Sequence, residues 1–185
     1  MGRPKGFSRE SVLQSAISVF WQKGFADTTL QDLEHATGVN KSGLYSEFKN
    51  KEDLFLASLQ HYLQFSSGTE ILSKQPLGWE NIQRFLEIGQ TCENGLRGCF
   101  AVNSMRDVAV LPPEAQQIIA KNLTLLKRHI VSNIKAESPS ADAGIMADTV
   151  LTFFSGLCIE QNLQSSSASA RRKIAGFMRF LHESR

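Results

Sequence analysis

The stretch TTLQDLEHATGVNKSGLYSEFKNKEDLF, residues 28 to 55, constrains the fold more than any other part of the chain. Its middle, residues 40 to 48, is short and polar, contains a glycine, and has helical patterns on both sides. Leu44 and Phe48 are four positions apart and form one apolar face. A helix this short is stabilised by packing rather than by its own propensity. We therefore expect Leu44 and Phe48 to face inward and the polar side chains to face outward.

The flanking segments carry residues that typically begin and end helices. Apolar residues recur at helical spacing in residues 9 to 23 and again from residue 30. Small polar residues precede each start, and a glycine follows each of these two patterns. Three short helices around the tight turn TGVN form a helix-turn-helix unit. The predicted N-caps are Ser8, Thr28 in a capping box with Gln31, Asn40 and Asn50, and the predicted ends are Gly24 and Gly38.

Composition excludes several classes of protein. The 185 residues, 42% of them apolar, suit one compact domain or one small and one medium domain. The three cysteines are too few and too scattered for a disulfide framework or a zinc pattern, so no metal or cofactor is expected. The start, MGRPKGFSRE, has no hydrophobic segment, so we expect no secretory signal there, and we expect no uncharged apolar run of the ~18 residues that a membrane helix needs. These features predict a cytoplasmic protein with no membrane partner.

Local clusters of basic residues are more informative than the net charge of +2. Lys41, Lys49 and Lys51 surround the third predicted helix, where Glu47 is the single acid. Lys51 also starts a helix, and the free N–H groups of a helix start attract anions. The alternative is that these are ordinary solvated lysines. The first nine residues add three basic residues and no acid, namely Arg3, Lys5 and Arg9.

The segment AISVFWQKGFADTTLQDLEHATGVNKSGLYSEFKNKEDLF, within residues 8 to 65, resembles the DNA-binding domain of the TetR family of bacterial transcriptional regulators. The landmarks are KGF at the end of the first helix, the paired threonines, ATGV, and GLYSEF followed by KNKEDL. The resemblance implies that residues 29 to 48 are the helix-turn-helix and that residues 41 to 46 face the major groove of DNA. Departures are Asn40, where a serine is more usual, and Glu47, where aromatic residues or histidine are common. An acid at that position would be repelled by phosphates.

The predicted DNA contacts are of three kinds. Lys41 can reach base edges or phosphates, and Tyr45 a phosphate or a thymine methyl. The N-terminal GRPKGF can place an arginine in a narrow A·T-rich minor groove, although a merely basic tail is the alternative. Thr29, Tyr45 and Lys51 match family positions that touch the phosphate backbone. The predicted DNA-binding residues are Arg3, Lys5, Thr29, Lys41, Ser42, Gly43, Tyr45, Ser46, Lys49 and Lys51.

Residues 67 to 185 read as helical throughout and follow a DNA-binding domain of residues 6 to 66. The expected fold is therefore all-α. The family resemblance implies that the second domain binds a small molecule and forms a homodimer. The last two helical segments, residues 140 to 164 and 170 to 185, are the candidate dimer interface because their apolar positions cover more than one face. Either face could instead be internal core.

The stretch GLRGCFAVNSMRD is the most specific feature of the second domain. Two glycines precede Cys99, which starts a helix, and a helix start and the nearby Arg97 both favour a thiolate. The stretch resembles a segment of TetR-type regulators, some of which sense electrophiles or oxidants through that cysteine, which implies that modification of Cys99 makes the dimer release DNA. The alternative is that Cys99 is a small buried hydrophobe. A Cys92–Cys99 disulfide requires Cα atoms within about 7 Å, and Cys158 is expected in the core.

The effector pocket cannot be assigned residue by residue, since aromatic stripes at helical spacing also form cores. A mostly apolar cavity with a few polar groups would suit a small organic molecule. The predicted effector or redox residues are Cys99, Phe100, Asn103, Phe154 and Gln161, and further pocket candidates are Trp79, Phe85, Met105, Phe153 and Asn162.

The sequence thus predicts a dimeric repressor that an effector or thiol modification releases from a palindromic operator in double-stranded DNA. One recognition helix contacts only a few base pairs. Two helices of a dimer can bind two half-sites that lie one helical turn, or a multiple of it, apart on palindromic DNA. One rival is a DNA-binding factor without an effector, although the second domain is larger than dimerisation requires. The other rival is a thiol-dependent enzyme, but no histidine forms a recognisable motif with Cys99 and no catalytic signature is present. We therefore expect no enzymatic activity.

Overall fold

The chain divides into two compact units. A computed structural model describes residues 7–89, 92–93, 96–137, 140–163 and 166–183. Unit 1 comprises Met1–Phe65 and Asn103–Ile119, and unit 2 comprises Ser66–Val102 and Ala120–Arg185. The expected domains, residues 6–66 and 67–185, differ from this division because Asn103–Ile119 groups with unit 1.

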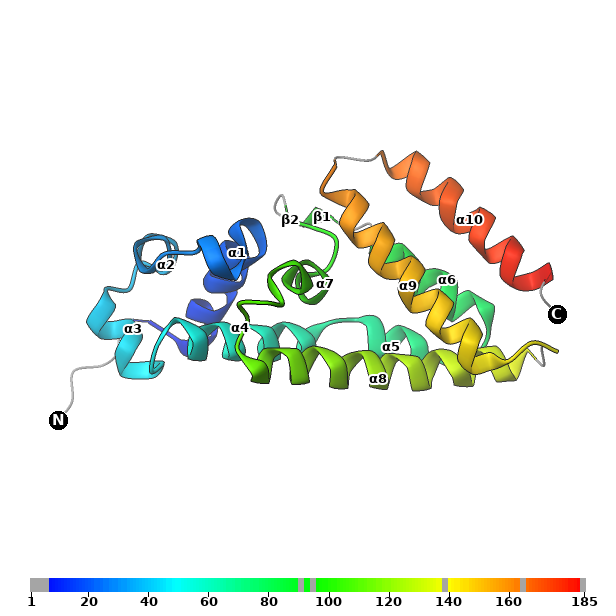
Figure 1. The fold of residues 1–185 in the computed structure, drawn as a ribbon, viewed down its shortest axis with the longest axis horizontal. Coiled ribbons are helices and arrows are strands. Elements are labelled where there is room, and N and C mark those ends of the chain that lie inside the picture. The colour runs from blue at the N-terminus through cyan, green and yellow to red at the C-terminus, as the bar shows by residue number, and fades with distance from the viewer. Residues whose placement is uncertain (1–6, 90–91, 94–95, 138–139, 164–165, 184–185) are drawn as a thin grey trace. The chain divides into compact units, whose positions relative to one another are not determined.

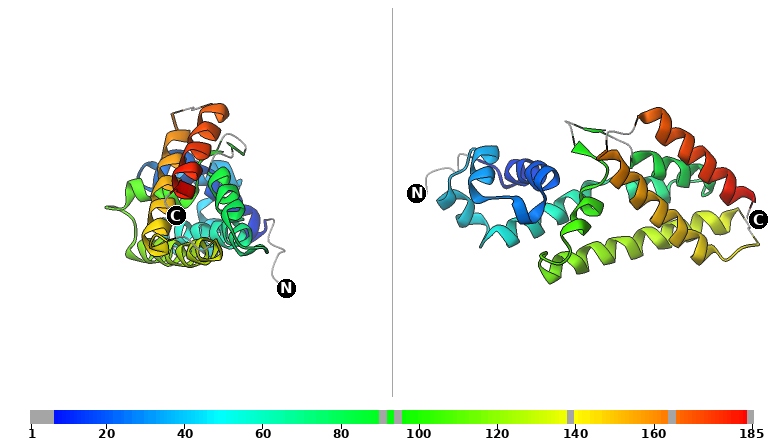
Figure 2. Two further views of the ribbon diagram at one scale, coloured as in Figure 1. Left: turned by 90° about the vertical axis from the view of Figure 1, so that its right-hand side faces the viewer. Right: turned by 45° about the horizontal axis from the view of Figure 1, so that its top comes forward.

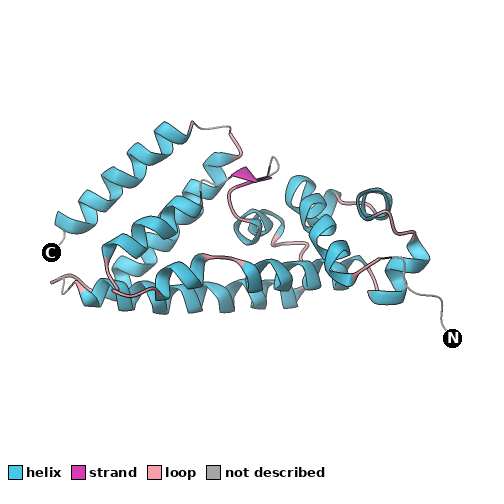
Figure 3. Cartoon of the chain, turned by 180° about the vertical axis from the view of Figure 1, so that it is seen from behind, coloured by secondary structure: helices cyan, strands magenta, loops and turns pink. Residues whose placement is uncertain are grey.

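Helices form almost all of the described structure (Figure 1). The all-α prediction is confirmed, and the strands in the described residues form one two-residue antiparallel ladder that pairs Cys92 with Arg97 (Figure 3). The elements are α1 (Arg9–Asp27), α2 (Leu30–Thr37), α3 (Lys41–Glu47), α4 (Lys51–Phe65), α5 (Gly68–Ser73), α6 (Trp79–Ile88), β1 (Cys92–Glu93), β2 (Leu96–Arg97), α7 (Phe100–Ser104), the 3-10 turn η1 (Met105–Asp107), α8 (Pro113–Ala136), α9 (Ala143–Gln161) and α10 (Ser167–Glu183).

The core of unit 1 forms where α1 packs on α2 and α4. The rings of Phe20 and Phe25 lie with their centroids 5.1 and 5.0 Å from that of Phe55. Leu44 and Phe48 are 1% and 2% exposed, as their spacing predicted. The short α3 is therefore anchored to the rest of unit 1 through one apolar face.

Most predicted helix boundaries of unit 1 are confirmed. Asn40 and Asn50 cap α3 and α4 through Gly43 N–H and Asp53 N–H, at 2.9 and 2.8 Å. Ser8 caps α1 in the same way, and α2 ends at Gly38, whose φ is 68°. Gly24 (φ 82°) breaks α1, although a last turn continues to Asp27.

The predicted capping box of Thr28 and Gln31 is wrong by one residue. Thr29 is the N-cap of α2, its hydroxyl accepts from Asp32 N–H at 3.2 Å, and Asp32 accepts from Thr29 N–H at 2.9 Å. Thr28 is buried, and its hydroxyl donates to the carbonyl of Gly24 at 2.6 Å. Both threonines fit the cap pattern in sequence, and burial decides between them.

In unit 2, α6, α9 and α10 pack against one another (Figures 1 and 2). Phe85 of α6 stacks on Phe154 of α9 with ring centroids 4.4 Å apart. Phe153, on the next face of α9, stacks on Phe177 of α10 at 4.0 Å. These ring contacts place α9 at the centre of the unit 2 core.

Helix α9 is also long and apolar enough to cross a membrane by length and composition alone, with a mean hydropathy of 1.4 over 18 residues. The sequence predicted no apolar run long enough for a membrane helix, so this property of α9 was not expected. Core helices of soluble proteins pass the same test. Asp148 and Glu160 lie within the helix, and its inner residues Val150, Phe154 and Leu157 are buried in unit 2.

Candidate nucleic-acid interface

The outward face of α3 collects most of the side chains that were predicted to read DNA. Leu44 faces the core, so the residues on either side of it turn toward solvent. Tyr45 is 40% exposed, and Lys41 Nζ lies 5.8 Å from the centre of its ring, within the range of a cation–π contact. The exposed residues of α3 are Lys41, Ser42, Tyr45 and Ser46, and Lys49 is exposed just beyond it.

Gly43 has an internal role in addition to its predicted one. A Cβ at this position would lie 2.6 Å from Val39 Cγ1 and 3.4 Å from Phe7 Cε1. Only glycine therefore lets α3 sit this close to its own turn. Its contact with DNA remains a prediction, and so do those of Arg3 and Lys5, which lie outside the described residues.

Arg9 holds the C-terminal end of α3. Its Nη1 donates to the carbonyl of Glu47 at 3.2 Å and lies 3.9 Å from the Glu47 carboxylate. The guanidinium also lies over the ring of Phe48, 4.4 Å from its centroid. The Glu47 side chain is only 16% exposed, so this acid is paired with Arg9 rather than directed outward.

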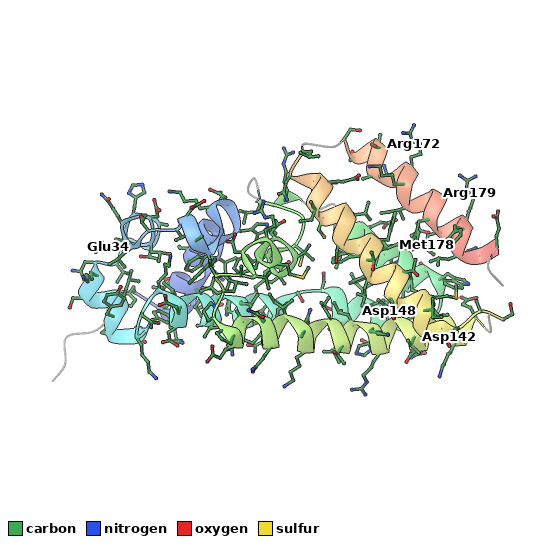
Figure 4. The ribbon with its side chains drawn as sticks, in the orientation of Figure 1. Glu34, Asp142, Asp148, Arg172, Met178 and Arg179 are labelled. Carbon is green, nitrogen blue, oxygen red and sulfur yellow. The ribbon has the colours of Figure 1, made fainter. Side chains whose placement is uncertain are left out.

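The N-terminal end of α3 is held by Asn40 and by a residue that the sequence analysis missed. The Glu34 carboxylate, from the last turn of α2, accepts the backbone N–H of Lys41 (Figure 4). An acid on a polar helix looks like an ordinary solvated residue in sequence. Its partner lies seven positions along the chain, across the turn, so no local pattern reveals the bond.

Thr29 and Asp32 form a polar cluster with Lys23 at the start of α2. The Thr29 hydroxyl donates to Asp32 Oδ2 at 2.8 Å, and Lys23 Nζ donates to Asp32 Oδ1 at 2.6 Å. Thr29 is exposed, but its hydroxyl proton is already used within the protein. A phosphate contact by this hydroxyl, which remains a prediction, would have to compete with Asp32.

Replacing Asp32 with asparagine is expected to flatten the acid limb of the stability curve. Hydrogen bonds from Lys23 and Thr29 hold the pKa of the Asp32 carboxyl well below its usual value. A carboxyl with a lowered folded pKa stabilises the fold above its unfolded pKa of about 3.9, and this contribution is lost as the pH falls toward the folded pKa. The difference in urea midpoint between wild type and Asp32→Asn should be full at pH 7 and shrink below about pH 4. A difference that does not vary with pH would contradict this assignment.

The ammonium group of Lys51 is bound within unit 1 rather than pointing freely to solvent. Its Nζ donates to the carbonyls of Phe25 and Thr28, both at 2.9 Å, and lies 4.5 Å from the centre of the Phe25 ring. Asp107 of η1 accepts the N–H of Phe25 at 2.7 Å. Asp107 therefore binds the backbone N–H just after Gly24, and Lys51 binds the carbonyls of Phe25 and Thr28. Together they hold the junction between α1 and α2.

Substituting Lys51 with alanine is expected to lower the free energy of unfolding by about 1–3 kcal/mol, because two carbonyls lose a charged donor. A third N–H of the ammonium can still reach a phosphate, so the salt slope of DNA binding should also fall by about one. Urea unfolding and a salt titration measure the two roles separately. Lys51→Met keeps the aliphatic stem and serves as the control for lost packing. An unchanged salt slope would mean that Lys51 touches no phosphate.

Four of the predicted effector residues are buried, and their role in an effector site remains a prediction. Phe100, Phe154 and Gln161 are buried in unit 2, and Asn103 is buried in unit 1. Phe100 and Phe154 are 0% and 5% exposed, as core residues are. Among the described residues, the indole Nε1 of Trp79 is buried without a hydrogen-bond acceptor.

Cys99 lies beside Cys158, a pair that sequence reasoning did not anticipate. A Cβ at Gly98 (φ 73°) would lie 2.5 Å from the carbonyl oxygen of Cys158, so this turn packs directly on α9. Burial, and secondarily the Cys99 thiol, raise the pKa of Cys158, which therefore stays protonated. Cys99 itself is half-buried. The side chain of Cys92 lies outside the described residues, and Arg97 Nη1 donates to the carbonyl of Gln161 at 3.4 Å.

Comparison with known proteins places this geometry in context. Residues 12–58 match the model of bacterial regulatory proteins, tetR family. The HTH-type transcriptional repressor ComR of Escherichia coli is 35% identical over 134 residues, which are 69% of this chain and 61% of ComR. The repressor BdcR of the same species is 26% identical over 164 residues, covering 84% and 80% of the two chains. A cysteine mutant of the TetR family regulator CifR, solved with 26-base-pair operator DNA, has the same fold, with a TM-score of 0.80, 22% identity, and coverage of 96% and 98%.

Proposed function

The chain belongs to the TetR family of bacterial regulatory proteins, and from this premise we propose that it is a cytoplasmic DNA-binding transcriptional repressor and not an enzyme. The chain aligns with about three fifths of ComR, 61% of its length. The observation that carries the proposal is the exposed face of α3, held at both ends by side chains of α1 and α2. We call α3 the recognition helix from here on.

In this proposal the recognition helix enters the major groove of double-stranded DNA. Lys41, Ser42, Tyr45 and Ser46 meet base edges or nearby phosphates. Arg3 and Lys5 precede Phe7, which packs against the start of the recognition helix. That position supports a minor-groove contact by the N-terminal arm. Phosphate contacts would come from Thr29, Lys49 and Lys51.

The proposed homodimer forms through the outer faces of α9 and α10. Ile145 and Ile159 of α9 are 69% and 39% exposed, and Phe180 of α10 is 58% exposed. A Cβ added at Gly156 or Gly176 would meet no atom within 4 Å, so small residues open this surface to a close helix approach. An exposed apolar face of this kind suits a second copy of the chain, which also matches the symmetry of a palindromic operator.

Release from the operator is proposed to follow binding of a small organic effector or modification of Cys99. An effector must bind the released form ~10⁴-fold more tightly than the DNA-bound form to move the equilibrium from mostly bound to mostly free. Of the two cysteines whose side chains the structure describes, Cys99 is the more accessible, so an oxidant or electrophile would reach it before Cys158.

The test is selection of genomic DNA fragments by the purified protein, with and without a thiol oxidant. Enrichment of a palindrome supports the regulator and supplies the operator, and loss of enrichment that a reductant restores supports a thiol sensor. The same oxidant arm with Cys99→Ser is the control. No enriched fragment at low salt in either redox state would overturn the proposed function. An operator whose affinity no oxidant or small molecule changes would favour a DNA-binding factor without an effector.

A further inference from the structure

The recognition helix is too weak to hold its own geometry. It has seven residues, and isolated helices shorter than about 12 residues are marginal in water. Leu44 and Phe48 anchor one face of it to unit 1, and its register relative to DNA depends further on what binds its ends. Arg9 fixes the C-terminal end through the Glu47 carbonyl and the Phe48 ring.

At the N-terminal end, Glu34 links two helices across the TGVN turn. Its backbone carbonyl accepts the N–H of Gly38 at 2.9 Å and so closes the last turn of α2. Its side-chain carboxylate accepts the N–H of Lys41, the first residue of the recognition helix. Asn40 takes the N–H of Gly43 by its side chain and that of Leu44 by its carbonyl, both at 2.9 Å. Glu34 therefore ties the start of the recognition helix to another helix.

Charge alone would argue against an acid at this place. Glu34 stands next to the surface that carries Lys41 and Tyr45, where the proposed function puts DNA phosphates. A carboxylate there weakens nonspecific attraction to DNA. Its hydrogen bond to the recognition helix offsets that cost only if the bond improves the fit of the helix to the operator.

We propose that Glu34 is a positioning residue for sequence-specific DNA binding: it fixes the first turn of the recognition helix against α2 without touching DNA. This inference rests on the proposed function. A helix whose first turn is loose spends part of its time out of register, and apparent affinity falls in proportion to the competent fraction. Operator binding needs that register because base edges are read at fixed positions, whereas nonspecific binding to phosphates does not.

Three substitutions separate the hydrogen bond from the charge. Glu34→Gln removes the charge and keeps an acceptor at the same reach, Glu34→Asp keeps the charge and shortens the reach, and Glu34→Ala removes both. Glutamine and alanine are both good helix formers, so α2 is not weakened by either. If the hydrogen bond matters, Glu34→Gln should behave like wild type and Glu34→Asp like Glu34→Ala. If only the charge matters, Glu34→Asp should behave like wild type and Glu34→Gln like Glu34→Ala.

We expect Glu34→Ala and Glu34→Asp to weaken operator binding on the order of tenfold, the effect of losing one helix cap. Glu34→Gln should bind the operator within about twofold of wild type or more tightly, because an acid near phosphate is gone. Binding to a scrambled duplex at the same salt should not weaken in either uncharged variant. Fluorescence anisotropy on both duplexes measures these affinities. Equal operator affinities for alanine and glutamine, whether high or low, would overturn the inference.

A second readout needs no DNA and keeps the inference separate from the proposed function. Amide hydrogen exchange across residues 40–48 should speed up in Glu34→Ala and Glu34→Asp and stay as in wild type in Glu34→Gln, while exchange in α4 stays unchanged. If wild type selects no DNA, the proposed function fails and this measurement still tests the positioning. Unchanged exchange in the alanine variant would show that Glu34 does not hold the recognition helix.

Discussion

Replacing Tyr45 with alanine is expected to weaken operator binding by about thirtyfold or more and leave a folded dimer. Tyr45 is 40% exposed on the recognition helix, and its loss leaves the buried side chains Leu44 and Phe48 in place. A direct contact to a base edge is worth ~1–3 kcal/mol of discrimination, and a dimer makes the contact twice. Anisotropy with the selected operator measures the affinity, and sedimentation of the free protein measures the oligomeric state.

Tyr45→Phe is the matched control because it removes the hydroxyl and keeps the ring. Loss in both variants would assign the contact to the hydroxyl, as expected for a phosphate or a base acceptor. Loss in alanine alone would assign it to the ring, as expected for a thymine methyl. An alanine variant that binds the operator as tightly as wild type would remove α3 from the role of recognition helix.

The fold was predictable where local rules determine the structure. Leu44 and Phe48 repeat at helical spacing, and both are buried. Asn40 and Gly38 are residues that begin and end helices for reasons of their own chemistry, and they do so here. The capping box failed because Thr28 and Thr29 satisfy the same local rule. Only the packing of α1 against α2 buries the first and leaves the second to cap.

The exposure of the side chains at the candidate site was predictable from the sequence. The contacts that hold the recognition helix in place were not. The outward positions of the recognition helix follow from the inward ones, since a helix has two sides. The contacts that hold it join distant residues: Arg9 reaches Glu47, 38 positions away, and Lys51 reaches Phe25, 26 positions away. A lysine that binds carbonyls and a lysine that binds phosphate look alike in sequence. The partner lies in another helix and is known only once the helices are packed.

The surroundings of the cysteines were unpredictable for the same reason, because their neighbours come from another helix. Cys99 and Cys92 are close in sequence and were considered as a pair. In the structure the turn at Gly98 packs on the backbone of Cys158, a residue of another helix. The turn that carries Cys99 therefore packs on α9, which the sequence spacing alone did not indicate.

Binding to a palindromic operator also requires dimerisation. The proposed dimer surface contains a glycine whose substitution tests it. Gly156 lies on the outer side of α9, where an added Cβ meets no atom within 4 Å. Glycine in a helix interior costs roughly 1 kcal/mol relative to alanine, so replacing it does not weaken the helix. Any loss of assembly at this position therefore reports on a partner rather than on the fold of one chain.

Gly156→Glu is expected to convert the dimer to a folded monomer and to reduce operator affinity by about a hundredfold or more. Two linked half-site contacts exceed a single one by roughly 10²–10⁴ in affinity, and the monomer loses that gain. The dimer would have to accommodate a long charged side chain from each protomer in a close helix contact, and α9 itself has no basic residue to pair with it. Sedimentation measures the mass, far-ultraviolet circular dichroism checks the helices, and anisotropy measures binding. Gly156→Ala, which also removes the glycine but adds only a methyl group, should remain a dimer. A glutamate variant that stays dimeric would move the interface away from α9, because no close helix contact accommodates that side chain.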